Sequence, residues 1–257
     1  MSLDRYRTAV VTGASRGIGA SIAATLAAQG MCVSLLGRDE AALRDVARGL
    51  GGAAHAAAVR VDVSDAQSVA RAFAAARGTY GPVDVLINNA GQAASAKFID
   101  TDEALWNRLM AVNLTGTYLC TREAITDMLR SGYGRIVNIA STAGLRGAAY
   151  ISAYATSKHA VIGLTRSLAL EYAQRDITVN AVCPGYVDTD IAQGAIANIM
   201  QKTGRSAAEA LGSLVATNPQ QRLIEPQEVA EAVLWLCRPG SESVTGQSIV
   251  LSGGEVT

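Results

Sequence analysis

A tyrosine and a lysine four residues apart, Tyr154 and Lys158, could move a proton together. Residues with this separation share one face of a helix. A phenol with a pKa of about 10 is a weak base at neutral pH, but a nearby ammonium group stabilises the phenolate. The pair therefore predicts a tyrosine that donates or accepts a proton during a reaction. On its own, however, the same spacing is common on helices and usually structural.

Two further polar residues could act with this pair. Ser141 directly follows the apolar segment 135–140, which is typical of a buried strand. Parallel α/β sheets present their ligand-binding groups at the carboxyl ends of the strands, so Ser141 is a candidate for contact with a substrate. Asn113 lies within the helical pattern of residues 102–130. The alternative is that Ser141 only forms a turn and that Asn113 is an irregularity inside a helix.

A glycine-rich turn forms a second candidate site. The sequence TGASRGIG at positions 12–19 joins an apolar segment to a helical pattern in which Ile18, Ile22 and Leu26 recur. Glycine permits a tight turn and allows backbone N–H groups to approach a pyrophosphate, whose charge the helix N-terminus stabilises. An ordinary turn would explain an isolated glycine triplet, but the place of this one between a strand and a helix favours a dinucleotide site.

The elements that must position these residues follow from the pattern of the whole chain. Short apolar segments alternate with amphipathic ones, which is typical of βαβ units on a parallel sheet. The predicted strands lack polar alternation, as expected for strands covered on both faces; they are 8–12, 31–36, 57–61, 83–88, 135–140, 178–184 and 248–251. The first predicted helix ends at Gly30, and the others are 40–49, 66–77, 102–130, 152–174 and 226–236. No linker or repeat interrupts the pattern, so we expect a single domain over residues 1–257.

One segment, residues 186–223, departs from this alternation. It contains no strand pattern, and one or two short helices are predicted there, one of them from the capping-box pair Ser206 and Glu209. A segment of this length inside a compact domain is usually a functional lid. We therefore expect residues 186–223 to cover a binding site.

Composition excludes several classes of protein. Of the 257 residues, 49% are apolar and only 17% are charged, so the chain can bury a large core. The 22 basic and 22 acidic residues cancel without a charged block, which argues against nucleic-acid and anionic-membrane partners. No run approaches the ~18 apolar residues of a membrane span, and residues 1–8 lack the apolar core of a secretory signal. These features predict a cytoplasmic protein.

The cysteines and histidines do not have the spacing of metal ligands. The four cysteines form no C-x-x-C pair and are expected to be buried thiols; they are Cys32, Cys120, Cys183 and Cys237. His55 and His159 fit neither a catalytic triad nor a metal site. The sequence therefore predicts no metal.

Taken in order, the motifs resemble those of the short-chain dehydrogenase/reductase family. The turn has the spacing Gly-x-x-x-Gly-x-Gly and is followed by Asn-Asn-Ala-Gly at 88–91, Asn113, Ser141 and Tyr154-x-x-x-Lys158. The resemblance runs from about Thr8 to Gly254. It implies an α/β fold, a single doubly wound Rossmann domain with a seven-stranded parallel sheet and a helical substrate lid. It also implies an NAD(P)-dependent oxidoreductase that interconverts a ketone and a secondary alcohol.

The same resemblance implies roles for individual residues. Tyr154 becomes the acid/base group, Ser141 a hydrogen-bond donor to the substrate carbonyl, and Lys158 a contact of the nicotinamide ribose. Asn113 is implied to hold a water that connects Lys158 to solvent. The implied cofactor-binding residues are Gly13, Ser15, Arg16, Gly17, Ile18, Gly19, Arg38, Asp62, Val63, Asn89, Ala90, Gly91, Tyr154, Lys158, Pro184, Gly185, Val187 and Thr189.

The end of the second predicted strand bears on the choice of cofactor. Family members that bind NAD carry an acidic residue at the position that corresponds to Gly37. This chain has Arg38 next to it and Arg16 in the glycine turn, and a guanidinium group can bind a 2′-phosphate in bidentate fashion. The resemblance therefore favours NADP(H) over NAD(H). The alternative is that Arg38 only caps a turn and that Arg16 is only solvated.

For the substrate, segments 134–141 and 177–185 resemble the 3-oxoacyl-thioester reductases most. This group includes carrier-protein reductases, polyketide ketoreductases and 3-hydroxyacyl-CoA dehydrogenases. Apolar residues of the predicted lid could line an acyl chain; they are Ile191, Ala195, Ile196, Ile199 and Met200. Three cations could attract the phosphates of CoA or of a phosphopantetheine arm, or could simply be solvated; they are Arg146, Lys202 and Arg205.

Other functions stay open at this point. A small cyclic alcohol, a steroid or a sugar is the alternative substrate. A regulator that binds the cofactor without catalysis would be expected to lack one of the four catalytic residues, and an extended-branch sugar-nucleotide epimerase needs a longer chain than 257 residues. The segments 102–130, 152–174 and 248–251 resemble the faces through which relatives form homotetramers. Val161, Leu164 and Leu168 favour such an assembly unless they are buried inside the subunit.

Overall fold

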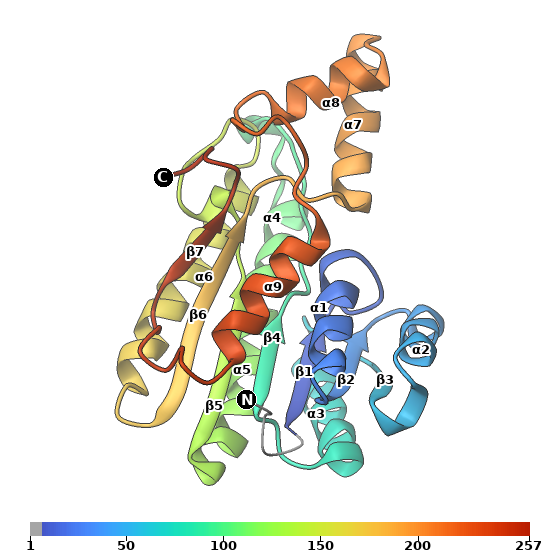
Figure 1. The fold of residues 1–257 in the computed structure, drawn as a ribbon. Coiled ribbons are helices and arrows are strands. Elements are labelled where there is room, and N and C mark those ends of the chain that lie inside the picture. Colours follow the sequence, from blue (N-terminus) through green and yellow to red (C-terminus); the bar gives the residue numbers. More distant parts are fainter. Residues whose placement is uncertain (1–6) are drawn as a thin grey trace.

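Seven parallel strands form one sheet in the computed structural model, which describes residues 7–257 (Figure 1). Residues 1–6, which carry most of the expectation about a secretory signal, lie outside the described residues. The strands are β1 Thr8–Thr12, β2 Cys32–Gly37, β3 Ala56–Arg60, β4 Val85–Asn88, β5 Tyr133–Ile139, β6 Asp176–Pro184 and β7 Ser248–Leu251. Every pair of neighbours is parallel. The predicted seven-stranded parallel sheet is confirmed.

The order of the strands places a crevice between β1 and β4. The sheet runs β3-β2-β1-β4-β5-β6-β7, so the chain moves outward from β1 to β3 and then crosses back to β4 on the other side of β1. In a doubly wound sheet, the connections that leave β1 and β4 diverge to opposite faces and open a ligand site at the carboxyl ends. The glycine-rich turn follows β1 and Asn89 follows β4.

Helices cover both faces of the sheet. The helices α1 Gly17–Ala28, α2 Glu40–Gly49 and α9 Pro226–Cys237 pack on one face, where Figure 1 shows α1 and α9 side by side. The helices α3 Ala66–Tyr80, α5 Gly116–Ser131 and α6 Ser152–Glu171 cover the other face. Because both faces are covered, β1 and β4 are buried along their whole length.

The predicted helix 102–130 is interrupted in the structure. It consists of α4 Glu103–Met110, a π-helical turn at Ala111–Thr115, and α5. Asn113 lies in the middle of this π-helical turn. Such turns are rare and occur often at functional sites. The sequence pattern predicted one continuous helix here and did not show the π-helical turn around Asn113.

The segment 186–223, which we call the helical insertion, stands away from the sheet (Figure 1). It contains α7 Asp190–Thr203 and α8 Ala207–Val215, and α8 begins with the predicted capping box between Ser206 and Glu209. A bridge between Val187 and Ile224 joins the two ends of the insertion. Ile196 packs between α7 and α8, together with the neighbouring Ala195 and Ile199. Most of the predicted apolar wall is therefore used to hold the two helices together, while Ile191 and Met200 stay exposed.

Three further expectations concern the cysteines, the assembly face and membrane-spanning helices. Cys120, Cys183 and Cys237 are buried, whereas Cys32 is half-buried. Val161 is buried within the subunit and Leu168 packs against its core, so neither supports an assembly face. Within residues 7–257, no helix is long and apolar enough to cross a membrane.

Candidate active site

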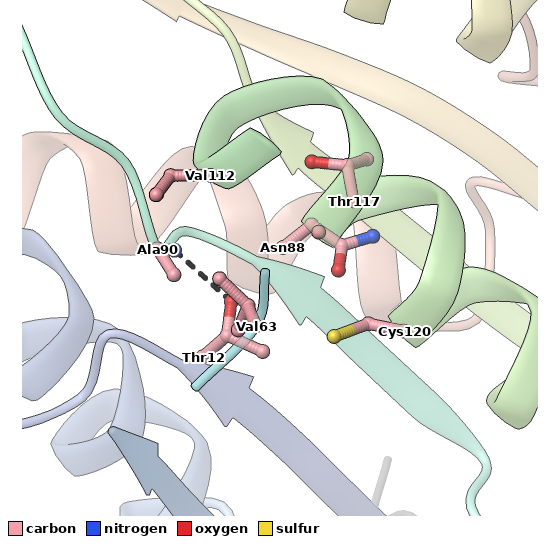
Figure 2. Close-up of a pocket in the computed structure, with 8 residues that line it drawn as sticks. Thr12, Val63, Asn88, Ala90, Val112, Thr117 and Cys120 are labelled. Carbon is pink, nitrogen blue, oxygen red and sulfur yellow. Dashed lines mark hydrogen bonds between the residues drawn. The ribbon is translucent and has the colours of Figure 1, made fainter. Parts of the chain in front are cut away.

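Hydrogen bonds join the turn after β1 to the turn after β4. The Thr12 hydroxyl accepts hydrogen bonds from the backbone N–H groups of Asn89 and Ala90, both at 3.0 Å, and Figure 2 shows the second of these. The Asn89 amide donates to the carbonyl oxygens of Thr12 at 3.0 Å and Gly13 at 3.1 Å. The two predicted cofactor segments, 12–19 and 89–91, therefore form one rigid unit at the crevice.

The glycines of the turn 12–19 lie where a side chain would not fit. Gly13 and Gly17 have φ values of +66° and +54°, which other residues rarely adopt. A Cβ atom on Gly19 would lie 2.3 Å from the Gly13 carbonyl oxygen and 2.6 Å from the Asn89 amide nitrogen. Arg16, the residue before α1, makes no side-chain cap, so its side chain leaves the first N–H groups of the helix free to bind an anion.

A positively charged residue, Arg38, follows the end of β2, the strand next to β1. Arg38 is exposed directly after Gly37, and Val61 donates a hydrogen bond to the Gly37 carbonyl oxygen at 2.8 Å. Hydrogen bonds from Ser64 lower the pKa of the Asp62 carboxyl, and the charge of Arg38 lowers it further. The predicted residues Arg38 and Asp62 are thus brought together where the ends of β2 and β3 meet.

Behind this unit, the space between β1, β4 and α5 is packed. Figure 2 shows Thr12, Val63, Ala90, Asn88, Val112, Thr117 and Cys120 around a gap that is too narrow for a water molecule. Asn88 donates hydrogen bonds to Thr121 at 3.0 Å and to Asn138 at 2.9 Å, and Asn138 donates to Thr165 at 2.9 Å. This buried polar chain links α5, β4, β5 and α6, and it fixes the helix that carries Tyr154.

Lys158 lies deep in the site. Its side chain is on α6, only 6% of the residue is exposed, and its ammonium group donates a hydrogen bond to the Ile139 carbonyl oxygen at 2.8 Å. Burial lowers the pKa of Lys158 to about 8, because the charged form loses its hydration. The Nζ atom lies 5.8 Å from the centre of the Tyr154 ring. The ammonium group therefore lies over the ring of Tyr154.

Tyr154 and Ser141 meet at the end of β5. Burial raises the pKa of the Tyr154 phenol, and a hydrogen bond with the Ser141 side chain acts in the opposite direction. Ser141 begins the 3₁₀ turn Thr142–Gly144, and its Oγ atom accepts a hydrogen bond from the Ala143 N–H group at 3.1 Å. At neutral pH, Tyr154 is protonated and can donate a proton.

The Asn113 side chain forms hydrogen bonds with the Gln92 backbone and with the Ser157 side chain. It is 1% exposed, and its amide nitrogen donates to the Gln92 carbonyl oxygen at 2.9 Å and to Ser157 at 3.0 Å. Its amide oxygen accepts from the Gln92 N–H group at 2.8 Å. Ser157 donates in turn to the Tyr154 carbonyl oxygen at 2.7 Å. The side chain thus joins the π-helical turn to α6, and the water implied between Asn113 and Lys158 stays a prediction.

The end of β6 brings the insertion to the glycine turn. Pro184 ends the strand, and Gly185 donates a hydrogen bond to the Leu251 carbonyl oxygen at 2.9 Å. A Cβ atom on Gly17 would lie 3.1 Å from the Thr189 methyl carbon, and Arg16 forms an ion pair with Asp190 at 2.9 Å. The predicted residues of both segments therefore face one crevice.

Two of the three cations that were predicted to attract phosphates have partners within the chain. Arg146 is ion-paired with Glu255, and Arg205 donates a hydrogen bond to Ser213 at 2.8 Å, whereas Lys202 is exposed. No motif in the sequence marks Glu255 or Tyr186 as part of the site, yet the Tyr186 phenol is close enough to raise the pKa of Tyr154. Only the paired glycines before Glu255 could have indicated a turn there. Among the described residues, no cluster of three His, Cys, Asp or Glu side chains could hold a metal ion.

Comparison with known proteins places this geometry in a family. The short chain dehydrogenase profile matches residues 7–199. A putative ketoacyl reductase of Streptomyces coelicolor is 39% identical over 257 residues, which cover 99% of this chain and 98% of that protein. A cis-4-hydroxycyclohexanecarboxylate dehydrogenase of Sinomonas cyclohexanicum is 40% identical over 96% of each protein. A crystal structure of an actinorhodin polyketide ketoreductase variant with NADPH has a TM-score of 0.94 and 38% identity, and each chain covers 99% of the other.

Proposed function

The chain belongs to the short-chain dehydrogenase family, and we propose that it is an NADP(H)-dependent reductase of 3-oxoacyl thioesters with Tyr154 as its acid/base group. The main support is that Ser141, Tyr154 and Lys158 lie together at the carboxyl ends of the strands, next to the glycine turn. A proton donor and a dinucleotide crevice at the same edge are what a carbonyl reductase requires.

The crevice fits a dinucleotide on its own geometry. A side chain at Gly13 or Gly19 would collide with the turn after β4, so glycine at these positions is what allows the two turns to pack together at the crevice. The pyrophosphate would lie at the N-terminus of α1. Arg16 and Arg38 would bind the 2′-phosphate of NADP, and the related ketoreductase structure with NADPH supports this choice. The remaining cofactor contacts that we assign are those predicted from the sequence.

The reaction then follows from the positions of three side chains. When bound, the nicotinamide supplies the hydride. The Ser141 hydroxyl polarises the carbonyl oxygen, and Tyr154 gives that oxygen its proton. Lys158 lowers the cost of the resulting phenolate through its positive charge. In the oxidative direction, the same phenolate accepts the proton of the alcohol.

Three features support a thioester substrate. Relatives named as ketoacyl or polyketide ketoreductases match nearly the whole chain. The helical insertion, which we assign as the substrate lid, presents Ile191 and Met200 as exposed apolar side chains. Lys202 and Arg205 lie at its tip and could meet phosphates. Arg146 is left out of this set because the buried Glu255 carboxylate binds its guanidinium group, whereas the pair of Arg16 and Asp190 is exposed on both sides.

A second candidate is a small cyclic alcohol. The relative at 40% identity is named for a hydroxycyclohexanecarboxylate. A direct comparison of acetoacetyl-CoA, its ethyl ester and 4-oxocyclohexanecarboxylate with NADPH separates the two candidates. We expect the thioester to have the highest kcat/KM. A higher value for the cyclic ketone would assign the second function instead.

The test of the mechanism is Tyr154→Phe, which removes one hydroxyl. We expect kcat to fall by about 10²–10⁴-fold, as is typical of general acid catalysis, with NADPH affinity largely unchanged. Tyr172→Phe, near the other end of the same helix, is the matched control and should retain wild-type turnover. Near wild-type turnover in the Tyr154 variant would refute the proposed role.

A further inference from the structure

The C-terminal tail carries a buried carboxylate that the proposed mechanism does not use. The side chain of Glu255 is only 7% exposed. One of its oxygens, Oε1, accepts hydrogen bonds from the Arg146 guanidinium and from the Thr217 hydroxyl. An ionised group in so dry a position is costly unless such partners satisfy it. The placement of Glu255 therefore calls for an explanation.

The partners of Glu255 come from segments that surround the reacting groups. Arg146 lies five residues after Ser141, in the loop that follows β5. Thr217 lies two residues after α8, where the helical insertion returns toward the sheet. The other carboxylate oxygen, Oε2, is 3.2 Å from the position of a Cβ atom on Gly185, at the end of β6. The Glu255 side chain thus joins three segments where the strands end: the loop after β5, the returning end of the insertion, and the end of β6.

Two glycines in the left-handed region turn the backbone directly before Glu255. Gly253 and Gly254 have φ values of +60° and +93°, and the Glu255 N–H group donates to the Ser252 carbonyl oxygen at 3.1 Å. A Cβ atom on Gly253 would lie 2.1 Å from the Asn218 amide oxygen, so the tail is in close contact with the end of the insertion. Figure 1 shows the C-terminus at the same end of the sheet as α7 and α8.

The charge of Glu255 also reaches the phenols of the site. Burial raises the pKa of Tyr186, the charge of Glu255 raises it further, and the charge of Arg146 lowers it. Tyr186 in turn influences Tyr154. The ion pair of Arg146 and Glu255 therefore lies close to the space where a substrate carbonyl would meet Tyr154.

We propose that Glu255 is a positioning residue of the substrate site, because it holds the loop after Ser141 and the returning end of the helical insertion against the end of β6. The inference rests on the proposed function, since these segments matter to catalysis only if a carbonyl is reduced at this edge. Glu255 does not touch the reacting atoms in this scheme. Its effect passes through Arg146 and Thr217.

The first test needs no substrate. Glu255→Gln removes the charge and keeps the size of the side chain, and Thr217→Val removes only the bond to the insertion. We expect hydrogen–deuterium exchange at residues 207–219 to rise at least fivefold in both variants, because the anchored end of the insertion opens more often. Glu242→Gln is the matched control, because that exposed carboxylate binds the Gly240 N–H group and is not in this network.

The second test measures catalysis with NADPH and acetoacetyl-CoA. We expect Glu255→Gln to raise KM for the thioester about tenfold while the Kd of NADPH stays within twofold of wild type. Adding Arg146→Gln to Glu255→Gln should cause little further loss, because both changes break the same ion pair. A merely structural role would lower the melting temperature without this split between the two ligands.

The possible results distinguish a failure of the positioning role of Glu255 from a failure of the proposed function. Exchange and KM in Glu255→Gln that match those of Glu242→Gln would overturn the positioning role, and wild-type exchange in Thr217→Val would do the same. Full activity of Tyr154→Phe would refute the proposed function, yet it would leave the exchange result on the free protein intact. If Glu255→Gln is poorly folded by circular dichroism, Thr217→Val alone decides the exchange test.

Discussion

Replacing Lys158 with methionine should remove a pH-dependent cost from the folded state. Burial lowers the pKa of Lys158 from 10.5 to about 8. At about 1.4 kcal/mol for each pH unit, this difference corresponds to about 3.5 kcal/mol. In the proposed mechanism, the ligand-free protein bears this cost because Lys158 has to act on Tyr154.

The pH range follows from which state holds the proton. Below pH 8, Lys158 is charged in the folded and the unfolded protein, so the full cost is present. Between pH 8 and 10.5, the folded state releases the proton while the unfolded state keeps it, so the stability of the wild type rises with pH. Methionine has no such dependence. It also leaves the Ile139 carbonyl oxygen without its donor, which costs about 1–3 kcal/mol at every pH.

The assay is urea unfolding of the ligand-free wild type and Lys158→Met at pH 7.0, 8.5 and 10.0. We expect the free energy of unfolding of the wild type to gain about 2–3 kcal/mol relative to the variant across this range. Lys97→Met, at an exposed lysine, should follow the wild type at every pH. Parallel curves for wild type and Lys158→Met would show that burial does not perturb Lys158, and the reasoning would fail.

Three further predictions concern the cofactor, the substrate and the assembly. We expect kcat/KM to favour NADPH over NADH at least tenfold, or about 1.4 kcal/mol. The double variant Gly37→Asp, Arg38→Val should reverse that preference in steady-state kinetics; a Cβ at Gly37 meets Leu43 at an ordinary 3.4 Å, so the aspartate fits. Lys202→Ala with Arg205→Ala should raise KM for a CoA thioester several-fold, and a difference that does not shrink at high salt would argue against phosphate binding. Light scattering at micromolar concentration should give the mass of a homotetramer, and a monomer would contradict this expectation.

The apolar pattern was sufficient to find every strand, but long-range contacts set several of the ends. The predicted strand 83–88 begins only at Val85 in the structure. The N–H group of Val83 instead donates to the Asp127 carboxylate on α5, at 3.2 Å. The end of α3, in contrast, has a local cause: the helix continues past Gly78 and stops at Gly81, where φ is +89°. Pro82 follows Gly81 directly and distinguishes it from Gly78, so the predicted helix end at residue 77 missed a signal that the sequence contains.

The site was predictable where its residues follow strands and not where it depends on tertiary contacts. Ser141 could be found because it follows β5 directly. The π-helical turn around Asn113 could not, because its asparagine bonds to Gln92 and Ser157, which are 21 and 44 residues away. Glu255 was missed for the same reason, since its partners Arg146 and Thr217 are 109 and 38 residues away.

The ion pairs at the two ends of the helical insertion differ in exposure, and we predict from this difference which end opens more often. At the α7 end, Arg16 and Asp190 form a pair whose side chains are 76% and 68% exposed, and exposed pairs contribute only about 0–1 kcal/mol. At the α8 end, the Glu255 carboxylate is buried among its partners. The α7 end should therefore open more often, and cofactor would enter beside the glycine turn while the returning end stays fixed. Hydrogen exchange should be faster at residues 189–193 than at 216–220, and the reverse order would show that the buried carboxylate is not the stronger anchor.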